Sequence, residues 1–431
     1  MSTSPGLRWF GRRRMATRQS PVSRIVLTPV GQSEGLRFTE WLVVGVLGLA
    51  YLLSISQPLF AVQLHRTMLN HLPLALLGPA LALHFLGVLA YRKALAWSEV
   101  FAVCWPLVLL GLYAITGSAV AKWELDIRET YLAFGVYLLL LPLFAALTFN
   151  GERVQQWAKV LVFLWVLASC AALAGELSRV KERETLHEIE YLVGSGFFVL
   201  YYVSRSAALK LLALLLLVGA AVINHKLTGY IVATMAVTHI VVMAGWRQLP
   251  RQWRGAYGLT AVVLTAALVA ALTLLYFEYR IYLPSGNPDV RLTQYEAAWR
   301  QFIESPLWGN AYLEGSGEEY REAGRVLNIP THSDVIDILK HGGLIGFGLF
   351  AWGYWKIFIV INRAVGLTRA DTVLCAFLTG ARFFQVTALI TFAINPILLK
   401  GPFLIVIWGN LGLAFGVALA SIRSARRAAS A

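Results

Sequence analysis

A polar segment late in the chain carries the residue types best suited to acid–base chemistry. His332 lies between Thr331 and Ser333. Nine residues separate Ser333 from Gly343, which together with Gly346 opens an apolar run. Thr331 or Ser333 can cap a helix here, so His332 would lie at the positive end of the helix dipole, which favours a neutral imidazole. A neutral imidazole is the form that a general base needs, and His332 is predicted to take a proton from a hydroxyl group. The alternative is a structural role in capping the helix.

Three cations near this segment are candidates for binding phosphate. Arg291 and Arg300 belong to the same long polar stretch, and Lys226 lies in a short turn between two apolar runs. An Arg binds a diphosphate through its planar fork and a Lys binds it as a point charge, so the three are predicted to hold a diphosphate together. The alternative is ordinary interfacial side chains that reach for lipid headgroups.

The remaining charged candidates are weaker. Arg382 lies inside an apolar run, where a charge must face the protein interior and have a partner, and a structural role is favoured over a supporting role in phosphate binding. Asp334 and Asp337 could orient the imidazole or hold a metal, but a solvated helix face or carboxylates that complement the helix dipole in the first turn are the favoured interpretations. Glu124 and Asp126 form a weak carboxylate pair that could hold a divalent ion. We predict no metal and no cofactor.

The composition identifies the environment of the chain. Of its 431 residues, 58% are hydrophobic and 14% are charged, and the mean hydropathy is +0.64. This is too apolar for a soluble surface and predicts a polytopic membrane protein. The net charge of +14 is dispersed between apolar runs, so it does not indicate nucleic-acid binding.

The apolar runs predict an all-α integral membrane protein with about twelve transmembrane helices. The runs lie near residues 41–62, 72–91, 99–116, 131–149, 157–175, 191–204, 207–223, 230–246, 256–277, 343–361, 372–393 and 402–420. This divides the chain into a basic tail (1–38), nine spans (39–277), a long loop (278–342), three spans (343–420) and a short tail (421–431).

The distribution of Lys and Arg predicts the orientation. Basic residues predominate in the tails and in the connections on their side of the membrane, which favours cytoplasmic termini and an external long loop. No apolar core follows the N-terminal arginines before Thr39, so this segment is predicted to be a basic tail rather than a cleaved signal. Either Met1 or Met15 could be the start.

The long loop is predicted to contain structure of its own. Apolar residues at helical spacing predict an amphipathic helix over 291–303, and Ser305, Pro306 and Gly309 then end it with turn chemistry. A polar stretch over 313–324 is interpreted as mobile. A second helix, capped near Ser333, is expected to lead into the span that starts near Gly343.

Together these residues resemble the O-antigen ligase family of bacterial membrane glycosyltransferases. The family signature of His, then Asn, Ser or Gln, nine residues and Gly-x-x-Gly is complete at His332, Ser333, Gly343 and Gly346. The family's loop Arg, aromatic helix and Pro-x-x-Gly turn are similar to Arg291, Trp299, Pro306 and Gly309. A second family Arg falls where this chain has Lys226.

The resemblance implies a fold of the integral-membrane glycosyltransferase (GT-C-like) type in the bacterial inner membrane, with its cavity facing the periplasm. The donor would be a glycan on undecaprenyl diphosphate, with its diphosphate at Arg291 and Lys226. His332 would deprotonate the acceptor hydroxyl, and the transfer would invert the anomeric carbon without metal or nucleotide. Ser333, Asp334, Arg382, Gly343 and Gly346 would support the site.

The resemblance leaves the acceptor open. The primary hypothesis is a ligase that transfers O-antigen to the lipid A core. The alternatives are a polymerase that extends a growing polysaccharide and an enzyme that modifies a Ser or Thr of a protein. A transporter is the alternative from another class, because about twelve spans would equally suit one.

Overall fold

The computed structural model describes most of the chain as helix. The described residues are 36–56, 75–86, 97–121, 125–149, 153–179, 190–224, 227–278, 288–312, 319–322, 325–328, 333–395 and 401–430.

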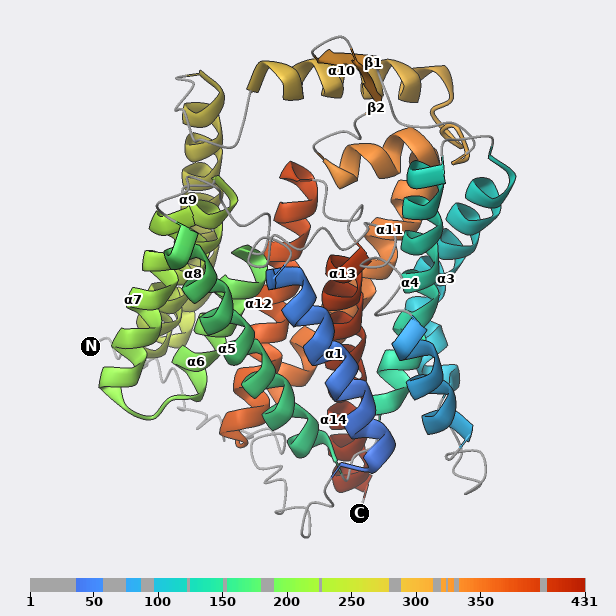
Figure 1. The fold of residues 1–431 in the computed structure, drawn as a ribbon. Coiled ribbons are helices and arrows are strands. Elements are labelled where there is room, and N and C mark those ends of the chain that lie inside the picture. The colour runs from blue at the N-terminus through green and yellow to red at the C-terminus, as the bar shows by residue number, and fades with distance from the viewer. Residues whose placement is uncertain are drawn as a thin grey trace, which may run out of the picture.

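Long helices form a bundle, and one helix lies across an end of it (Figure 1). The crossing helix is α10 (Pro288–Glu304), and we call the end that it covers the loop end. The bundle helices are α1 (Phe38–Ser56), an apolar helix over Ala75–Leu86, α3 (Trp97–Val120), α4 (Leu125–Thr148), α5 (Val154–Arg179), α6 (Glu190–Val203), α7 (Ala207–Asn224), α8 (Leu227–Gln248), α9 (Arg251–Glu278), α11 (Asp334–Leu367), α12 (Thr372–Ile394), α13 (Gly401–Leu404), the π-helical turn η2 (Ile405–Gly409) and α14 (Asn410–Ser430).

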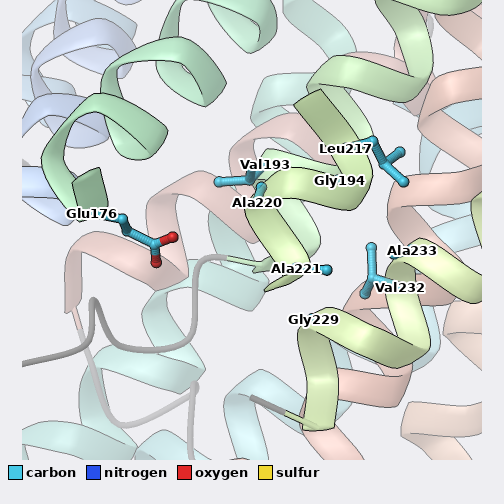
Figure 2. Close-up of a pocket in the computed structure, with 9 residues that line it drawn as sticks. All are labelled: Glu176, Val193, Gly194, Leu217, Ala220, Ala221, Gly229, Val232 and Ala233. Atoms are coloured by element: carbon cyan, nitrogen blue, oxygen red, sulfur yellow. The ribbon is translucent and has the colours of Figure 1, made fainter. Parts of the chain in front are cut away.

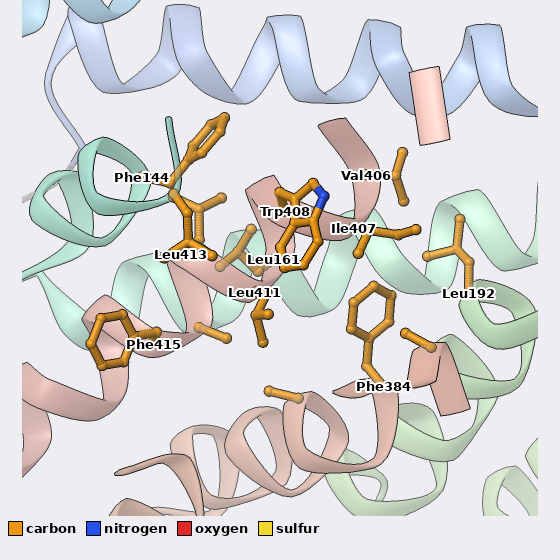
Figure 3. Close-up of a cluster of buried hydrophobic side chains, with 14 of the residues drawn as sticks. Phe144, Leu161, Leu192, Phe384, Val406, Ile407, Trp408, Leu411, Leu413 and Phe415 are labelled. Atoms are coloured by element: carbon orange, nitrogen blue, oxygen red, sulfur yellow. The ribbon is translucent and has the colours of Figure 1, made fainter. Parts of the chain in front are cut away.

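The C-terminal helix forms the centre of the bundle. In the window that would cross a membrane, 94% of the residues of η2 and α14 are buried, and α14 contacts α4, α5, α11 and α12. Figure 3 shows Trp408 and Phe415 among apolar side chains from the surrounding helices. By contrast, the window in α9 has no buried residue, so α9 lies at the edge.

Asn410 is a polar connection inside this apolar centre. Its side-chain oxygen accepts hydrogen bonds from Tyr51 of α1 and from Trp165 of α5, the latter at 2.7 Å. Its amide donates to the carbonyl of Val406 in the π-helical turn. Because buried polar groups need partners, Asn410 fixes the relative positions of three helices.

The predicted spans agree with the described helices. Each of the twelve apolar runs coincides with an apolar helix, and eight helices in the described part of the chain are long and apolar enough to cross a membrane. The chain is therefore a multi-pass, mostly helical membrane protein, while the number of spans stays a prediction. The segments shorter than a full span include α6 and α7.

The elements differ from the prediction in two places. Helix α14 continues to Ser430, beyond the predicted end of the last span. The predicted mobile stretch overlaps an antiparallel hairpin of β1 (Glu319–Glu322) and β2 (Arg325–Asn328). The amphipathic helix and the cap at Ser333 are confirmed.

Removing the side chain of Asn410 should weaken the bundle. In Asn410→Ala, the buried donors of Tyr51 and Trp165 lose their acceptor, and we expect a loss of about 1–3 kcal/mol of stability. Thermal unfolding of the purified protein in detergent measures this. Leu268→Ala, on the exposed surface of α9, is the control and should melt like the wild type. Equal melting of Asn410→Ala and this control would contradict the proposed role.

Candidate functional site

Arg291 is held between α10 and the end of α12. The face of α10 that packs on the bundle carries Arg291, Gln294, Ala298 and Phe302, at the spacing of one helix face. Arg291 is only 9% exposed, and its Nη1 donates a 3.1 Å hydrogen bond to the carbonyl oxygen of Ile394. This carbonyl belongs to the last turn of α12, where the helix dipole is negative and favours a cation.

The start of α8 also contacts the end of α12. Asn395, which caps α12, donates from Nδ2 to Oγ1 of Thr228 at 3.0 Å. Leu227 also packs in an apolar cluster with Ile394. Lys226 lies outside the described residues and immediately precedes Leu227 in the sequence.

The first turn of α11 completes this arrangement. Ser333 is the N-cap of α11, and its hydroxyl accepts a 3.4 Å hydrogen bond from the backbone of Ile336. Val335, in the first turn, lines the same cavity as Ala393 of α12. His332 lies outside the described residues and immediately precedes this cap. The start of α8, Arg291 of α10 and the start of α11 therefore meet at the loop end of α12.

Arg300 does not join Arg291. The two residues are nine positions apart, which is about two and a half helical turns, so they point to opposite sides of α10. The Arg300 side chain is 76% exposed and lies 3.9 Å from Glu296 on the outer face. The prediction that both arginines serve one cationic site is therefore not supported by the geometry.

Arg382 belongs to a separate polar group deeper in the bundle. Its guanidinium donates to Oδ1 of Asn362 at 2.9 Å and lies 3.0 Å from Nε2 of His239. It has the partners expected for a charge inside a span. Twelve residues of α12, about 18 Å, separate it from Ile394. This distance favours a structural role over a supporting role at the loop end.

The two aspartates of α11 agree with one of their favoured interpretations and contradict the other. Asp334 and Asp337 are 1% and 3% exposed, so the interpretation as a solvated helix face is wrong. Both lie in the first turn, where the positive end of the helix dipole favours carboxylates, as the other interpretation predicted. Tyr312 of the 305–312 turn lies near Asp337, and spacing in the sequence alone does not reveal such burial.

The signature glycines have a structural explanation. Helix α11 bends at Gly343, whose φ is +61°, and the turn after α10 places Gly309, with φ +64°, against the bend. A Cβ at Gly343 would lie 2.4 Å from the Leu307 carbonyl oxygen, and one at Gly309 would lie 2.4 Å from that of Lys340. Only glycine permits both the conformation and this approach.

Hydrogen bonds join the two backbones at this contact. The N–H groups of Leu344 and Ile345 donate to the carbonyls of Pro306 and Leu307 at 2.8 and 3.1 Å. Asn310 N–H donates to the Lys340 carbonyl at 3.1 Å. The Pro-x-x-Gly turn thus supplies acceptors for the N–H groups that the bend releases from the helix. Gly346 differs, since a Cβ there would meet only ordinary contacts at 3.6 Å or more.

His341 is a second buried histidine that the sequence interpretation did not include. Its Nδ1 lies 2.7 Å from Oδ1 of Asn310, which also accepts the backbone N–H of Tyr312. The oxygen is therefore the acceptor, and His341 carries its proton on Nδ1. Tyr312 and Tyr131 pack against the ring. Its position two residues before Gly343 was the available signal.

Tyr312 connects this aromatic cluster to the first turn of α11. The side chain is completely buried, and burial, followed by the nearby charges of Tyr113 and Asp337, raises the pKa of its hydroxyl. The Tyr113 hydroxyl donates to the Trp308 carbonyl at 2.7 Å. The cluster therefore fixes the 305–312 turn on α3 as well as on α11.

A buried carboxylate lies in another part of the loop end. Glu176 of α5 is 6% exposed and lines a small cavity of about 20 Å³ with residues of α6, α7 and α8. Figure 2 shows its side chain extending from α5 toward the space between these helices. Gly229, in the first turn of α8, lies on the opposite side of the cavity. The sequence interpretation did not single out Glu176.

The fold and the contacts at the loop end define a multi-pass membrane protein with an Arg buried over a helix end. Residues 191–351 match the family model described as O-antigen ligase, so this part of the chain is similar to a family of membrane glycosyltransferase-type enzymes. The matched range includes Lys226, Arg291, His332 and the two signature glycines. No curated protein matches the chain.

The two signature glycines should respond differently to alanine. Gly343→Ala forces a side chain into a backbone conformation (φ +61°, ψ −162°) that is essentially restricted to glycine and costs about 1–3 kcal/mol, and it also drives the new Cβ into the Leu307 carbonyl. We expect it to lower the melting temperature and to expose the 305–312 turn to limited proteolysis. Gly346→Ala is the matched control and should keep both properties. Equal proteolysis of the two variants would contradict the backbone role of Gly343.

Proposed function

We propose that this protein transfers a glycan from undecaprenyl diphosphate to the hydroxyl of an acceptor sugar, and that the acceptor is the lipid A core. The protein would reside in the bacterial inner membrane with both termini in the cytoplasm and the loop end in the periplasm. The observation that carries the proposal is the meeting of three segments at the loop end of α12, with Arg291 buried there. The match of residues 191–351 to the O-antigen ligase family model supports the class of reaction.

The electrostatics at this place suit the departure of a diphosphate. Arg291 uses one guanidinium nitrogen on the Ile394 carbonyl, and its remaining N–H groups can serve an anionic oxygen. Lys226, which immediately precedes α8, would add a second cation. Cations held in place by the fold stabilise the charge that develops on the leaving group. The free diphosphate is a good leaving group, so the proposal invokes no metal.

His332 would act on the acceptor. As the acceptor oxygen bonds to the anomeric carbon, its proton passes to the imidazole, and the bond from that carbon to the diphosphate oxygen breaks. The attack from the face opposite the leaving group inverts the anomeric carbon. The cap at Ser333 supports this role, because a histidine next to a helix N-terminus is favoured in its neutral form.

Arg291 and Arg300 provide a matched test of the cationic part of the proposal. Arg291→Ala should lower the rate of transfer from the lipid diphosphate by about 10²–10³-fold, as for loss of one preorganised charge contact. Arg300→Ala should keep a near-normal rate, because its side chain lies on the outer face of α10. The measurement is the rate of transfer by the purified enzymes in vesicles, compared at equal amounts of folded protein. A larger loss in Arg300→Ala than in Arg291→Ala would contradict the assignment.

The acceptor is tested in a deletion strain of the source organism that carries the wild-type or the His332→Ala protein. We expect His332→Ala to lower transfer by about 10²–10⁴-fold. The lipopolysaccharide gel should then show lipid A core without O-chain, while lipid-linked glycan accumulates. Core that carries a single repeat unit would instead identify a polymerase. An unchanged lipopolysaccharide ladder at normal protein levels would mean either that His332 is not essential or that this glycan is not the substrate.

A further inference from the structure

A cavity of about 320 Å³ lies between α11 and α12. Along α11 its lining extends from Phe347 to Phe358, about 16 Å at the helical rise. Gln385 is the one amide among lining residues that are otherwise apolar or aromatic. We call this cavity the α11–α12 groove, and its lining consists of Val335, Phe347, Phe350, Ala351, Tyr354, Trp355, Phe358, Gln385, Val386, Leu389 and Ala393.

The floor of the groove is held by two reciprocal hydrogen bonds. The Tyr354 hydroxyl donates to the Gln385 carbonyl, and Nε2 of Gln385 donates to the Tyr354 carbonyl, both at 2.7 Å. Both residues are buried, so these bonds set the separation of the two helices. The rim is open, because Trp355 and Leu389 are 58% and 39% exposed. The groove is therefore preformed and opens to the lipid-facing surface of the bundle.

The upper end of the groove adjoins the cationic site. Val335, two residues after the cap at Ser333, and Ala393 line that end. The next residue after Ala393 is Ile394, whose carbonyl accepts the hydrogen bond from Arg291. A molecule with an anionic group at Arg291 and a hydrocarbon chain attached to it would find the groove directly beneath its anionic end.

We infer that the α11–α12 groove holds the first isoprene units of the polyprenyl chain of the donor. This inference rests on the proposed function. A cavity of about 150 Å³ accommodates a benzene molecule, so the groove has room for about two fragments of that size, or about two isoprene units. The rest of the chain would lie in the bilayer.

The groove would orient the donor rather than concentrate it. Lipid tails are as apolar as the groove, so moving a chain between them yields little hydrophobic free energy. Close packing against the aromatic wall would instead fix the direction of the chain and so the position of the diphosphate at Arg291. Such positioning is a kinetic contribution, since a small misplacement of reacting groups slows a reaction by up to about 10²-fold.

The test fills the groove and compares donors that differ only in chain length. Ala393→Trp places an indole at its upper end, and Ala267→Trp, on the exposed surface of α9, is the matched control. Each protein is assayed in vesicles with glycosyl diphosphates that carry one or eleven isoprene units. We expect the preference for the long-chain donor to fall by on the order of tenfold or more in Ala393→Trp, and to persist in the control. An equal preference in both variants would overturn the inference.

A binding measurement separates failure of the groove from failure of the proposed function. A photoreactive benzoylphenylalanine is placed at Leu389, on the rim, or at Leu268, on α9, and exposed to labelled undecaprenyl diphosphate without acceptor. Cross-linking at Leu389 in clear excess over Leu268 supports the groove even if wild-type transfer is absent, which would overturn only the proposed function. Equal labelling at both positions would overturn the groove even if transfer occurs.

Discussion

The architecture of the loop end depends on one backbone constraint, the bend of α11 at Gly343. A bend releases N–H groups from the helix, and the interior of a membrane protein offers no water to satisfy them. Here the carbonyls of Pro306 and Leu307 accept the N–H groups of Leu344 and Ile345. The same contact fixes the turn that ends α10. Since α10 is held at its C-terminal end, Arg291 near its start is fixed across the bundle on the end of α12.

The end of α12 then acts as the meeting point of distant segments. Its last carbonyl accepts a hydrogen bond from Arg291, and its cap Asn395 donates one to Thr228. Near the same end, Ala393 shares a groove with the start of α11. Each contact joins segments that are separated by many residues in the chain. The arrangement places a polar, cationic region directly above an apolar groove. An amphiphile with an anionic head and a hydrocarbon tail fits this division.

Local chemistry explains which features of the fold could be predicted. The apolar runs, the amphipathic pattern of α10, the cap at Ser333 and the turn at Pro306 and Gly309 each depend on residues close in sequence. Helical spacing would also have separated Arg291 from Arg300, because nine residues turn a helix by about half a revolution more than two full turns. The prediction grouped them by charge and proximity in sequence, without considering this rotation.

The sequence by itself determined a membrane-embedded helical chain with a loop helix and a complete His–Gly signature, because hydropathy, capping and turn preferences act over a few residues. Only the tertiary structure decided that Arg291 is buried while Arg300 is exposed, that Asp334 and Asp337 are enclosed, and that Gly309 and Gly343 meet. It also decided the position of the α11–α12 groove. These properties come from packing between segments far apart in the chain, and no local pattern encodes which surfaces will face each other.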